Sequence, residues 1–169
     1  MRIFNHSTPQ AVSALEHGIA DFAVVTTPVS TDMPLEVTPL MDFQEILVCG
    51  ENFKFLSKKA LSLRELNEYP LVMLGRDTMT NAFYNHLFLQ HDFIWSPDIE
   101  VATTDQLLPM IRANLGIGFL PAPLAQDALE HHVIYQIPLQ ESIPLRQVTL
   151  LHDPRRPLSI AAKEFLKFL

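Results

Sequence analysis

Three short segments combine hydroxyl side chains with the expected start of a helix. They are Asn5-His6-Ser7-Thr8, Gly75-Arg76-Asp77-Thr78 and Thr103-Thr104-Asp105. A helix N-terminus presents backbone N–H groups that lack intrahelical partners and the positive end of the helix dipole, so it receives anions well. Arg76 adds a guanidinium suited to a carboxylate, although its neighbour Asp77 is an alternative partner. If the segments converge they form a site for a small carboxylate; taken singly, each hydroxyl is explained as a helix cap.

The remaining reactive side chains form no catalytic or metal-binding motif. The seven histidines include no pair spaced as in HExxH, and only His6 lies in a candidate binding turn. Cys49 falls in an apolar, strand-like run, where a thiol is expected to be buried and inert. No GxSxG motif, phosphate-binding loop or dinucleotide fingerprint is present. We therefore predict that the chain is not an enzyme and uses no cofactor or metal.

The composition is that of a folded, acidic domain. Of the 169 residues 48% are hydrophobic and 18% charged, and 12 Lys and Arg against 19 Asp and Glu give a net charge of −7. Nucleic-acid binding relies on neutralising phosphates, so this chain is a poor DNA binder by itself. No apolar run approaches the roughly 18 residues that span a bilayer. With one cysteine and no signal-peptide core, the sequence predicts a cytoplasmic protein without a membrane partner.

The elements that must position the candidate residues alternate between strand and helix patterns. Helices are predicted to start at Ser7, at the capping box Ser62–Glu65, after Thr78, at Thr103 or Thr104, at Pro121 and at Pro157, with Gly18 and Gly116 ending the first and fourth. Strands are predicted at residues 3–4, 22–25, 35–40, 45–49, 71–74, 99–102, 117–120, 133–137 and 146–151. This alternation favours an α/β fold with mostly parallel strands, in which ligands bind at the carboxyl ends of the strands.

Four segments, in order along the chain, resemble the effector-binding domain of LysR-type transcriptional regulators. His17–Val25 is similar to the family's strand entry with its Gly and Asp, and Pro39–Val48 is similar to the strand that follows. Leu61–Val72 is similar to the next short helix and strand, and Ala113–Pro121 to a glycine-rich segment. Asn114 stands where the family usually has Gly. Together the segments cover nearly the whole chain, which makes the resemblance fairly specific.

The resemblance implies the fold of type 2 periplasmic binding proteins, with two α/β lobes joined by two crossing strands and a ligand cleft between them. Lobe one would comprise residues 1–27 plus 145–169, and lobe two residues 28–144, together one effector-binding domain. Carried over from the family, the effector-binding residues are Asn5, Ser7 and Thr8 on lobe one, Thr26 and Thr27 at the hinge, Arg76, Thr78, Thr103 and Thr104 on lobe two, and Phe119 and Pro121 as pocket wall.

The start of the chain departs from the family pattern. Members of the family begin with a winged helix-turn-helix and a linker helix, followed by the strand and helix that open lobe one. The resemblance implies that this chain begins at the second strand of the effector domain and is therefore N-terminally truncated. We expect an exposed apolar surface where the missing helix would pack.

The function implied by the resemblance is the sensing of a small-molecule effector, a carboxylate or other anion, bound in the interlobe cleft to control transcription. Lobe closure would shift the population between two conformations. The full-length protein is implied to be a homo-oligomer, a dimer or tetramer, which contacts DNA only through the missing N-terminal domain. The alternative is a fragment of a solute-binding protein for transport, which would share the fold; a signal peptide upstream would favour it.

Overall fold

The computed structural model describes residues 2–168 and divides them into two compact units. Among the described residues, unit 1 comprises 2–42 and 146–168, and unit 2 comprises 43–145. The later boundary lies within one residue of the predicted one. The earlier boundary follows residue 42 and not residue 27 as predicted, because a strand at residues 36–43 pairs in the sheet of unit 1.

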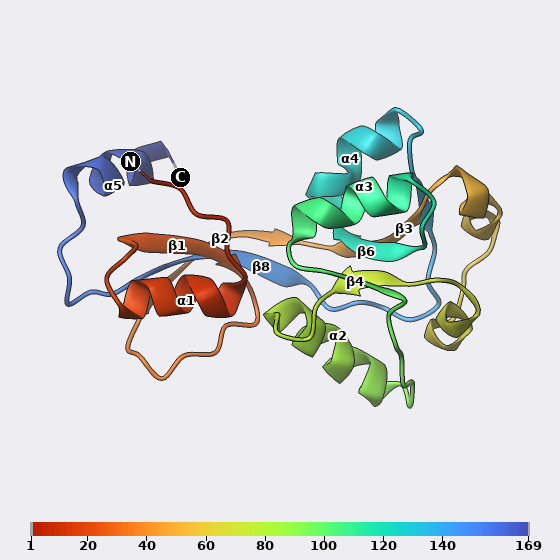
Figure 1. The fold of residues 1–169 in the computed structure, drawn as a ribbon, viewed down its shortest axis with the longest axis horizontal. Helices are drawn as coiled ribbons and strands as arrows, with labels where there is room; N and C mark the ends of the chain where they lie inside the picture. The colour runs from red at the N-terminus through yellow and green to blue at the C-terminus, as the bar shows by residue number, and fades with distance from the viewer. Residues whose placement is uncertain (1, 169) are drawn as a thin grey trace. The chain divides into compact units, whose positions relative to one another are not determined.

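Unit 1 is built on a three-stranded sheet with the order β1-β8-β2 (Figure 1). Helix α1 packs on one face through Val12 and Leu15, which meet Val25 and Leu151 of the sheet. Its elements are α1 (Thr8–Glu16), β1 (Phe22–Thr26), β2 (Glu36–Phe43), β8 (Arg146–His152), α5 (Ile160–Phe165) and the 3-10 turn η4 (Leu166–Phe168).

The ends of α1 follow the local sequence signals. Ser7 is the N-cap, and the side-chain oxygen of Gln10 accepts its backbone N–H at 3.0 Å. Gly18 adopts a positive φ of 67° just after the helix, as predicted for a C-terminal stop. The guanidinium of Arg156 donates to the carbonyl of Glu16 at 3.0 Å and occupies the space into which a side chain at Gly18 would project.

Unit 2 contains a three-stranded sheet, β6-β3-β7, and a parallel pair, β4-β5. An isolated parallel bridge between Leu71, just before β4, and Ile117, just before β6, links the pair to the three-stranded sheet, and a second bridge joins Leu61 to Leu139. The elements are β3 (Glu45–Cys49), the 3-10 helices η1 (Glu51–Lys58) and η2 (Leu63–Glu68), β4 (Val72–Leu74), α2 (Met79–Gln90), β5 (Ile99–Val101), η3 (Thr104–Gln106), α3 (Leu107–Arg112), β6 (Gly118–Pro121), α4 (Ala122–Glu130) and β7 (Tyr135–Ile137).

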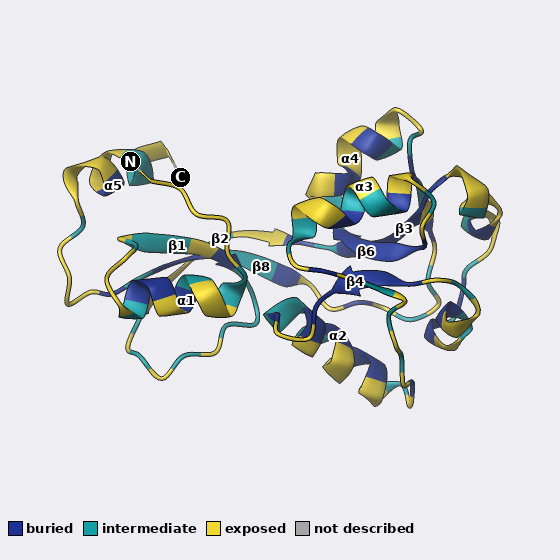
Figure 2. Ribbon diagram, viewed as in Figure 1, coloured by how far each residue is buried: buried dark blue, intermediate teal, exposed yellow. Residues whose placement is uncertain are grey.

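Strands β3 and β4 of unit 2 are covered on both faces, as their continuous apolar runs predict (Figure 2). Leu47 and Cys49 face a core that includes Tyr84 and Phe88 of α2. Val48 faces a second core that includes Ile111 of α3. The sheet therefore fixes the helices on both sides, and with them the turns at which the helices begin.

The prediction of mostly parallel pairing was wrong. The β1–β8, β3–β6 and β3–β7 ladders are antiparallel, and only β4–β5 is a parallel ladder among the registers of the described strands. The prediction assumed that strands adjacent in sequence pair through βαβ crossovers. Strand β1 instead pairs with β8, which lies more than 100 residues further along the chain, so no crossover rule governs its direction.

Three predicted boundaries also differ from the structure. Residues 3–4 do not form a strand. Helix α3 ends at Arg112, and the positive φ of 62° falls on Asn114, so Asn114 and not Gly116 takes the left-handed position after the helix. Asparagine tolerates this conformation, which explains how it can replace the family's glycine here. The last helix is capped by Ser159, whose hydroxyl accepts the N–H of Ala162 at 3.2 Å, and does not begin at Pro157.

Candidate functional site

Strands β4 and β5 bring two of the three candidate turns to the same edge of unit 2. The strands are parallel and in register, with Leu74 opposite Val101 as the last pair. The N–H of Gly75 extends the ladder by donating to the carbonyl of Val101 at 2.9 Å. The turn at residues 75–78 and the turn at 102–104 therefore start at the same level, and each opens a helical segment. Two helix N-termini lie at the carboxyl edge of parallel strands, where α/β proteins bind ligands.

The hydroxyl of Thr78 holds the first turn in shape by donating one hydrogen bond and accepting another. Its Oγ1 donates to the carbonyl of Gly75 at 2.8 Å and accepts the N–H of Asn81 at 3.1 Å, as an N-cap does. Asn81 is itself buried and donates to the carbonyl of Leu74 at 2.9 Å. The side chain of Thr78, 6% exposed, thus holds the turn in shape. Asn81, which the sequence reasoning missed, anchors the same turn to the end of β4.

Arg76 extends from this turn into solvent. Its side chain is 78% exposed, and its Nε lies 3.3 Å from Oε1 of Glu100 on β5. The sequence predicted Asp77 as the alternative partner of the Arg76 guanidinium, but the structure shows Glu100 in contact with it. The sequence reasoning missed Glu100 because it lies on another strand. With Asp77 and Glu100 beside Arg76, the local formal charge is −1, from one positive and two negative side chains. An exposed ion pair of this kind is weak, so a stronger acceptor can take the guanidinium from it.

The second turn is closed by a capping box. Thr103 is the N-cap, and the side-chain oxygen of Gln106 accepts the N–H of Ala102 at 3.0 Å and that of Thr103 at 3.3 Å. Thr103 and Thr104 are both half-buried at the edge of the unit. At residues 103 and 104 this turn therefore presents two uncharged hydroxyl side chains beside the turn of Arg76.

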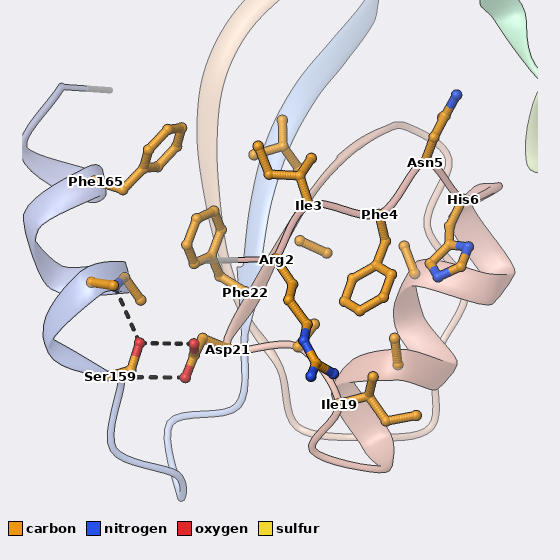
Figure 3. Close-up of a pocket in the computed structure, with 17 residues that line it drawn as sticks. Arg2, Ile3, Phe4, Asn5, His6, Ile19, Asp21, Phe22, Ser159 and Phe165 are labelled. Carbon is orange, nitrogen blue, oxygen red and sulfur yellow. Dashed lines mark hydrogen bonds between the residues drawn. The ribbon is translucent and has the colours of Figure 1, made fainter.

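The third candidate segment lies in unit 1, at the start of α1. Ser7 caps the helix, Thr8 is its first residue, and both are half-buried. Asn5 is exposed and lines a cavity of about 510 Å³ (Figure 3). Within unit 1 these residues follow an extended stretch, residues 2–6, which is not paired as a strand.

Thr26 and Thr27 are tied to a buried arginine. Arg146, 3% exposed, donates from Nε to the carbonyl of Thr27 at 2.7 Å and from Nη2 to Oγ1 of Thr26 at 2.9 Å. The Oγ1 of Thr27 accepts the N–H of Gln147 at 2.9 Å. These bonds fix the turn before the cis peptide bond Thr27–Pro28 onto the start of β8. The sequence reasoning missed Arg146; the signal for it was a charged residue at the start of a strand whose later residues Leu150 and Leu151 are buried.

The two expected wall residues differ in their surroundings. Phe119 is 3% exposed and lies in the core of unit 2, where its ring centroid is 4.6 Å from that of Tyr84 and 6.1 Å from that of Phe88. Pro121 ends β6 opposite Glu45, is half-buried and serves as the N-cap of α4. Phe119 therefore acts within the core and has no open face toward a ligand.

The thiol of Cys49 has the surroundings of a structural residue. Cys49 is fully buried, and this burial, together with the charge of Glu51, raises the pKa of its thiol to about 11. Among residues 2–168 there is no group of three or more His, Cys, Asp or Glu side chains placed to share a metal ion. In the same part of the chain, no helix has the length and apolarity that a membrane crossing needs.

Comparison with known proteins identifies the family of this chain. The family model for the LysR substrate binding domain matches residues 1–169. The chain is 24% identical over 157 residues to the hydrogen peroxide-inducible genes activator of Haemophilus influenzae, covering 92% of this chain and 52% of that protein. It is 26% identical over 174 residues to the HTH-type transcriptional regulator YbhD of Escherichia coli, covering 100% of this chain and 53% of the relative. The chain thus spans about half the length of these relatives.

Solved structures of low sequence identity share the fold. The effector-binding domain of QuiR in complex with shikimate matches with a TM-score of 0.81 at 19% identity, covering 99% of this chain and 78% of that one. The regulatory domain of Synechocystis CcmR in complex with 2-PG matches with a TM-score of 0.80 at 17% identity, covering 99% and 79%. The relatives are transcriptional regulators and not enzymes, as predicted. The match of the family model over the whole chain shows that the protein belongs to the LysR substrate-binding-domain family.

Proposed function

We propose that this chain senses a small carboxylate or other anion and is the effector-binding domain of a LysR-type transcriptional regulator. The observation that carries this proposal is the in-register parallel pair β4–β5, which sets the turns of Arg76 and Thr103 side by side at one edge of unit 2. Two helix N-termini and one exposed guanidinium then face the same region. These are the groups that accept a carboxylate.

The roles of the residues differ in this proposal. Arg76 leaves its weak contact with Glu100 and binds the carboxylate through its paired donors. Thr103 and Thr104 donate hydroxyl hydrogen bonds to the ligand. Thr78 keeps the turn in shape, since its hydroxyl is already used twice. The polar residues Asn5, Ser7 and Thr8 of unit 1 are proposed as further contacts, and a cleft between the two units stays a prediction.

The solved relatives support an acidic ligand. The QuiR domain was solved with shikimate, a carboxylate, and the CcmR domain with 2-PG. A ligand of similar charge for this chain is consistent with its helix N-termini. The acidic side chains of Asp77 and Glu100 are expected to limit its affinity for simple inorganic anions, so the ligand must offer hydroxyl or other polar groups as well.

We also propose the context in which the domain works. The relatives are named as HTH-type regulators and are about twice as long as this chain. DNA contact is assigned to a part of the protein outside residues 1–169, in agreement with the net charge of −7. The working protein is proposed to be a cytoplasmic homo-oligomer, a dimer or tetramer. The match to regulators removes the reason to pursue the transport alternative.

Binding measurements with matched variants test the site. Native mass spectrometry of the purified chain first shows whether a metabolite is retained, and shikimate and 2-PG then serve as probes in calorimetry. Arg76→Gln removes a charge-assisted hydrogen bond worth about 1.5–3 kcal/mol, which is a loss of about ten- to a hundredfold in affinity. Thr103→Val is expected to weaken binding several-fold. Arg64→Gln, at an exposed position of η2 in the same unit, is the control. Binding that Arg76→Gln and Thr103→Val leave unchanged would refute the site.

A further inference from the structure

A network of side-chain hydrogen bonds runs along helix α2 from the end of β4 (Figure 1). Nδ2 of Asn81 donates to the carbonyl of Leu74 at 2.9 Å. Oδ1 of Asn81 accepts Nδ2 of Asn85 at 2.7 Å, and Oδ1 of Asn85 accepts the indole Nε1–H of Trp95 at 2.6 Å. Asn81, Asn85 and Trp95 thus form one amide network, which joins the candidate turn at residues 75–78 to the loop at residues 91–98.

The chemistry of its two ends gives the amide network a single direction. The indole nitrogen of Trp95 only donates, and the carbonyl of Leu74 only accepts. Each asparagine between them turns its oxygen toward Trp95 and its NH₂ toward Leu74. Turning either amide over would set oxygen against oxygen at one contact and donor against donor at the other. The orientation of Asn81 is therefore coupled to that of Asn85, which Trp95 fixes.

The positions of the two asparagines on α2 make this coupling possible. Residues 81 and 85 are four apart, so their side chains are neighbours on the helix surface. Asn81 is 3% exposed, and a buried amide needs partners for both of its ends, which Leu74 and Asn85 supply. Asn85 is exposed, so its amide is held by its hydrogen bonds and not by burial.

The far end of the amide network is anchored in the core of unit 2. Trp95 packs edge-on against Phe88 with ring centroids 5.4 Å apart. Phe93, 3% exposed, packs edge-on against the same ring at 5.3 Å. The carbonyl of Ile94 accepts Nδ2 of Asn67 at 3.4 Å, which ties the loop to η2. The indole is thus held in a fixed place, from which its N–H orients Asn85.

The near end of the amide network holds the turn that carries Arg76. The Arg76 side chain is exposed and its ion pair with Glu100 is weak, so the backbone of the turn decides where the guanidinium is presented. Leu74, which accepts the last bond of the network, directly precedes this turn. The backbone N–H of Asn81 donates to Oγ1 of Thr78 on its other side. Whatever orients Asn81 therefore also orients the turn.

We propose that Asn85 and Trp95 are positioning residues of the candidate anion site and act on the turn at residues 75–78 through Asn81. The amide network keeps this turn in the conformation that presents Arg76. It also couples the turn to the loop at residues 91–98, so a change at the turn is felt at the indole, because coupling between two places acts in both directions. The role of positioning rests on the proposed function, which assigns a ligand to this turn.

The substitution Asn85→Asp reverses one contact of the amide network at nearly constant size. Its carboxylate still accepts the Trp95 N–H but sets a second oxygen against Oδ1 of Asn81, so the bond from Asn81 to the end of β4 is expected to be lost. NMR of the ligand-free protein is expected to show the amide resonances of residues 75–78 displaced. A residue that only stabilises the fold would change the free energy of unfolding and leave these native-state resonances in place.

A matched control separates the network from the effect of charge. Ala82→Asp places the same carboxylate at an exposed position of α2 that is nearer to the turn and outside the network. The resonances of residues 75–78 are expected to move further in Asn85→Asp than in Ala82→Asp, by about threefold or more. Trp95→Phe keeps an aromatic ring and removes the N–H, and is expected to displace the same resonances in the absence of any added charge.

The coupling is also tested from the opposite end. Thr78→Val changes the turn and leaves Trp95 in place, and the indole Nε1–H resonance is expected to move. Unmoved resonances of residues 75–78 in Asn85→Asp, equal displacement by Ala82→Asp, or an unmoved indole resonance in Thr78→Val would each overturn the proposal. If Asn85→Asp does not fold, Trp95→Phe decides by the same resonances. These measurements need no ligand, so their failure is distinct from failure of the anion site, which Arg76→Gln tests by binding.

Discussion

The substitution Thr78→Val gives a direct measure of how the first turn of the candidate site is held. Valine keeps the shape of the side chain and removes the hydroxyl, which belongs to a residue only 6% exposed and makes two hydrogen bonds. Loss of an N-cap costs about 1 kcal/mol. Loss of the bond to the Gly75 carbonyl costs about 1 kcal/mol more. We therefore expect the free energy of unfolding to fall by about 2 kcal/mol.

The single tryptophan reports on this unfolding. Trp95 donates from Nε1 to Oδ1 of Asn85 at 2.6 Å and packs edge-on against Phe88 at 5.4 Å, so it contacts α2 directly. Its fluorescence in a urea titration follows the helix that Thr78 caps. For a urea dependence of about 2 kcal/mol per molar, the expected loss moves the midpoint down by about 1 M without a change in slope.

Two further variants decide whether the hydroxyl is responsible. Thr78→Ser keeps both hydrogen bonds and loses one methyl group, so its cost is expected to be about 1 kcal/mol or less. Thr38→Val, on the exposed part of β2, is expected to change stability by less than about 0.5 kcal/mol. A midpoint for Thr78→Val within about 0.2 M of the wild-type value would refute the role of this hydroxyl in holding the turn.

Three other perturbations test the structure at separate places. Cys49, with a thiol pKa raised to about 11 by burial, is expected not to react with Ellman's reagent at pH 8 until the chain is unfolded; rapid labelling of the native chain would contradict this. Glu65 has its pKa lowered by the hydrogen bond from the backbone N–H that it caps, so its stabilisation is full above its unfolded pKa of about 4.3 and is lost as the pH falls through the folded value. Glu65→Gln should flatten the pH dependence of the urea midpoint between about pH 5 and 3, and an unchanged slope would contradict this. Arg146→Met leaves two half-buried acceptors without their donor and should cost about 2 kcal/mol in calorimetric unfolding, more than the exposed control Lys167→Met.

Local sequence signals predicted the helix caps and the buried strands that depend on residues close together in the sequence. The capping box of Ser62 and Glu65 forms as expected, with the carboxylate accepting the Ser62 N–H at 2.7 Å. Thr78 caps α2, and Gly18 follows α1 with a positive φ. The apolar runs of β3 and β4 are buried. These features depend on residues a few positions apart, whose hydrogen bonds and burial are readable from residue type and spacing.

The sequence by itself also determined the family, through four segments whose residue patterns lie in the right order, and the match of the family model confirms it. It named the hydroxyl turns of unit 2 as candidate ligand contacts. What it could not provide was the role of each residue within a turn. Thr78 and Phe119 are residue types that often contact ligands. In the structure the Thr78 hydroxyl serves in a helix cap, and the Phe119 ring packs in an aromatic core.

Tertiary structure alone decided which distant segments meet. Residues from different elements meet in the antiparallel β1–β8 pair, in the hydrogen bond of Arg146 to Thr26 and in the contact of Arg76 with Glu100. The unit boundary after residue 42 likewise depends on the pairing of distant strands. Such contacts depend on the packing of whole strands and helices, and hydrophobic burial, which drives that packing, is non-directional, so local patterns do not encode which partner each edge or side chain finds.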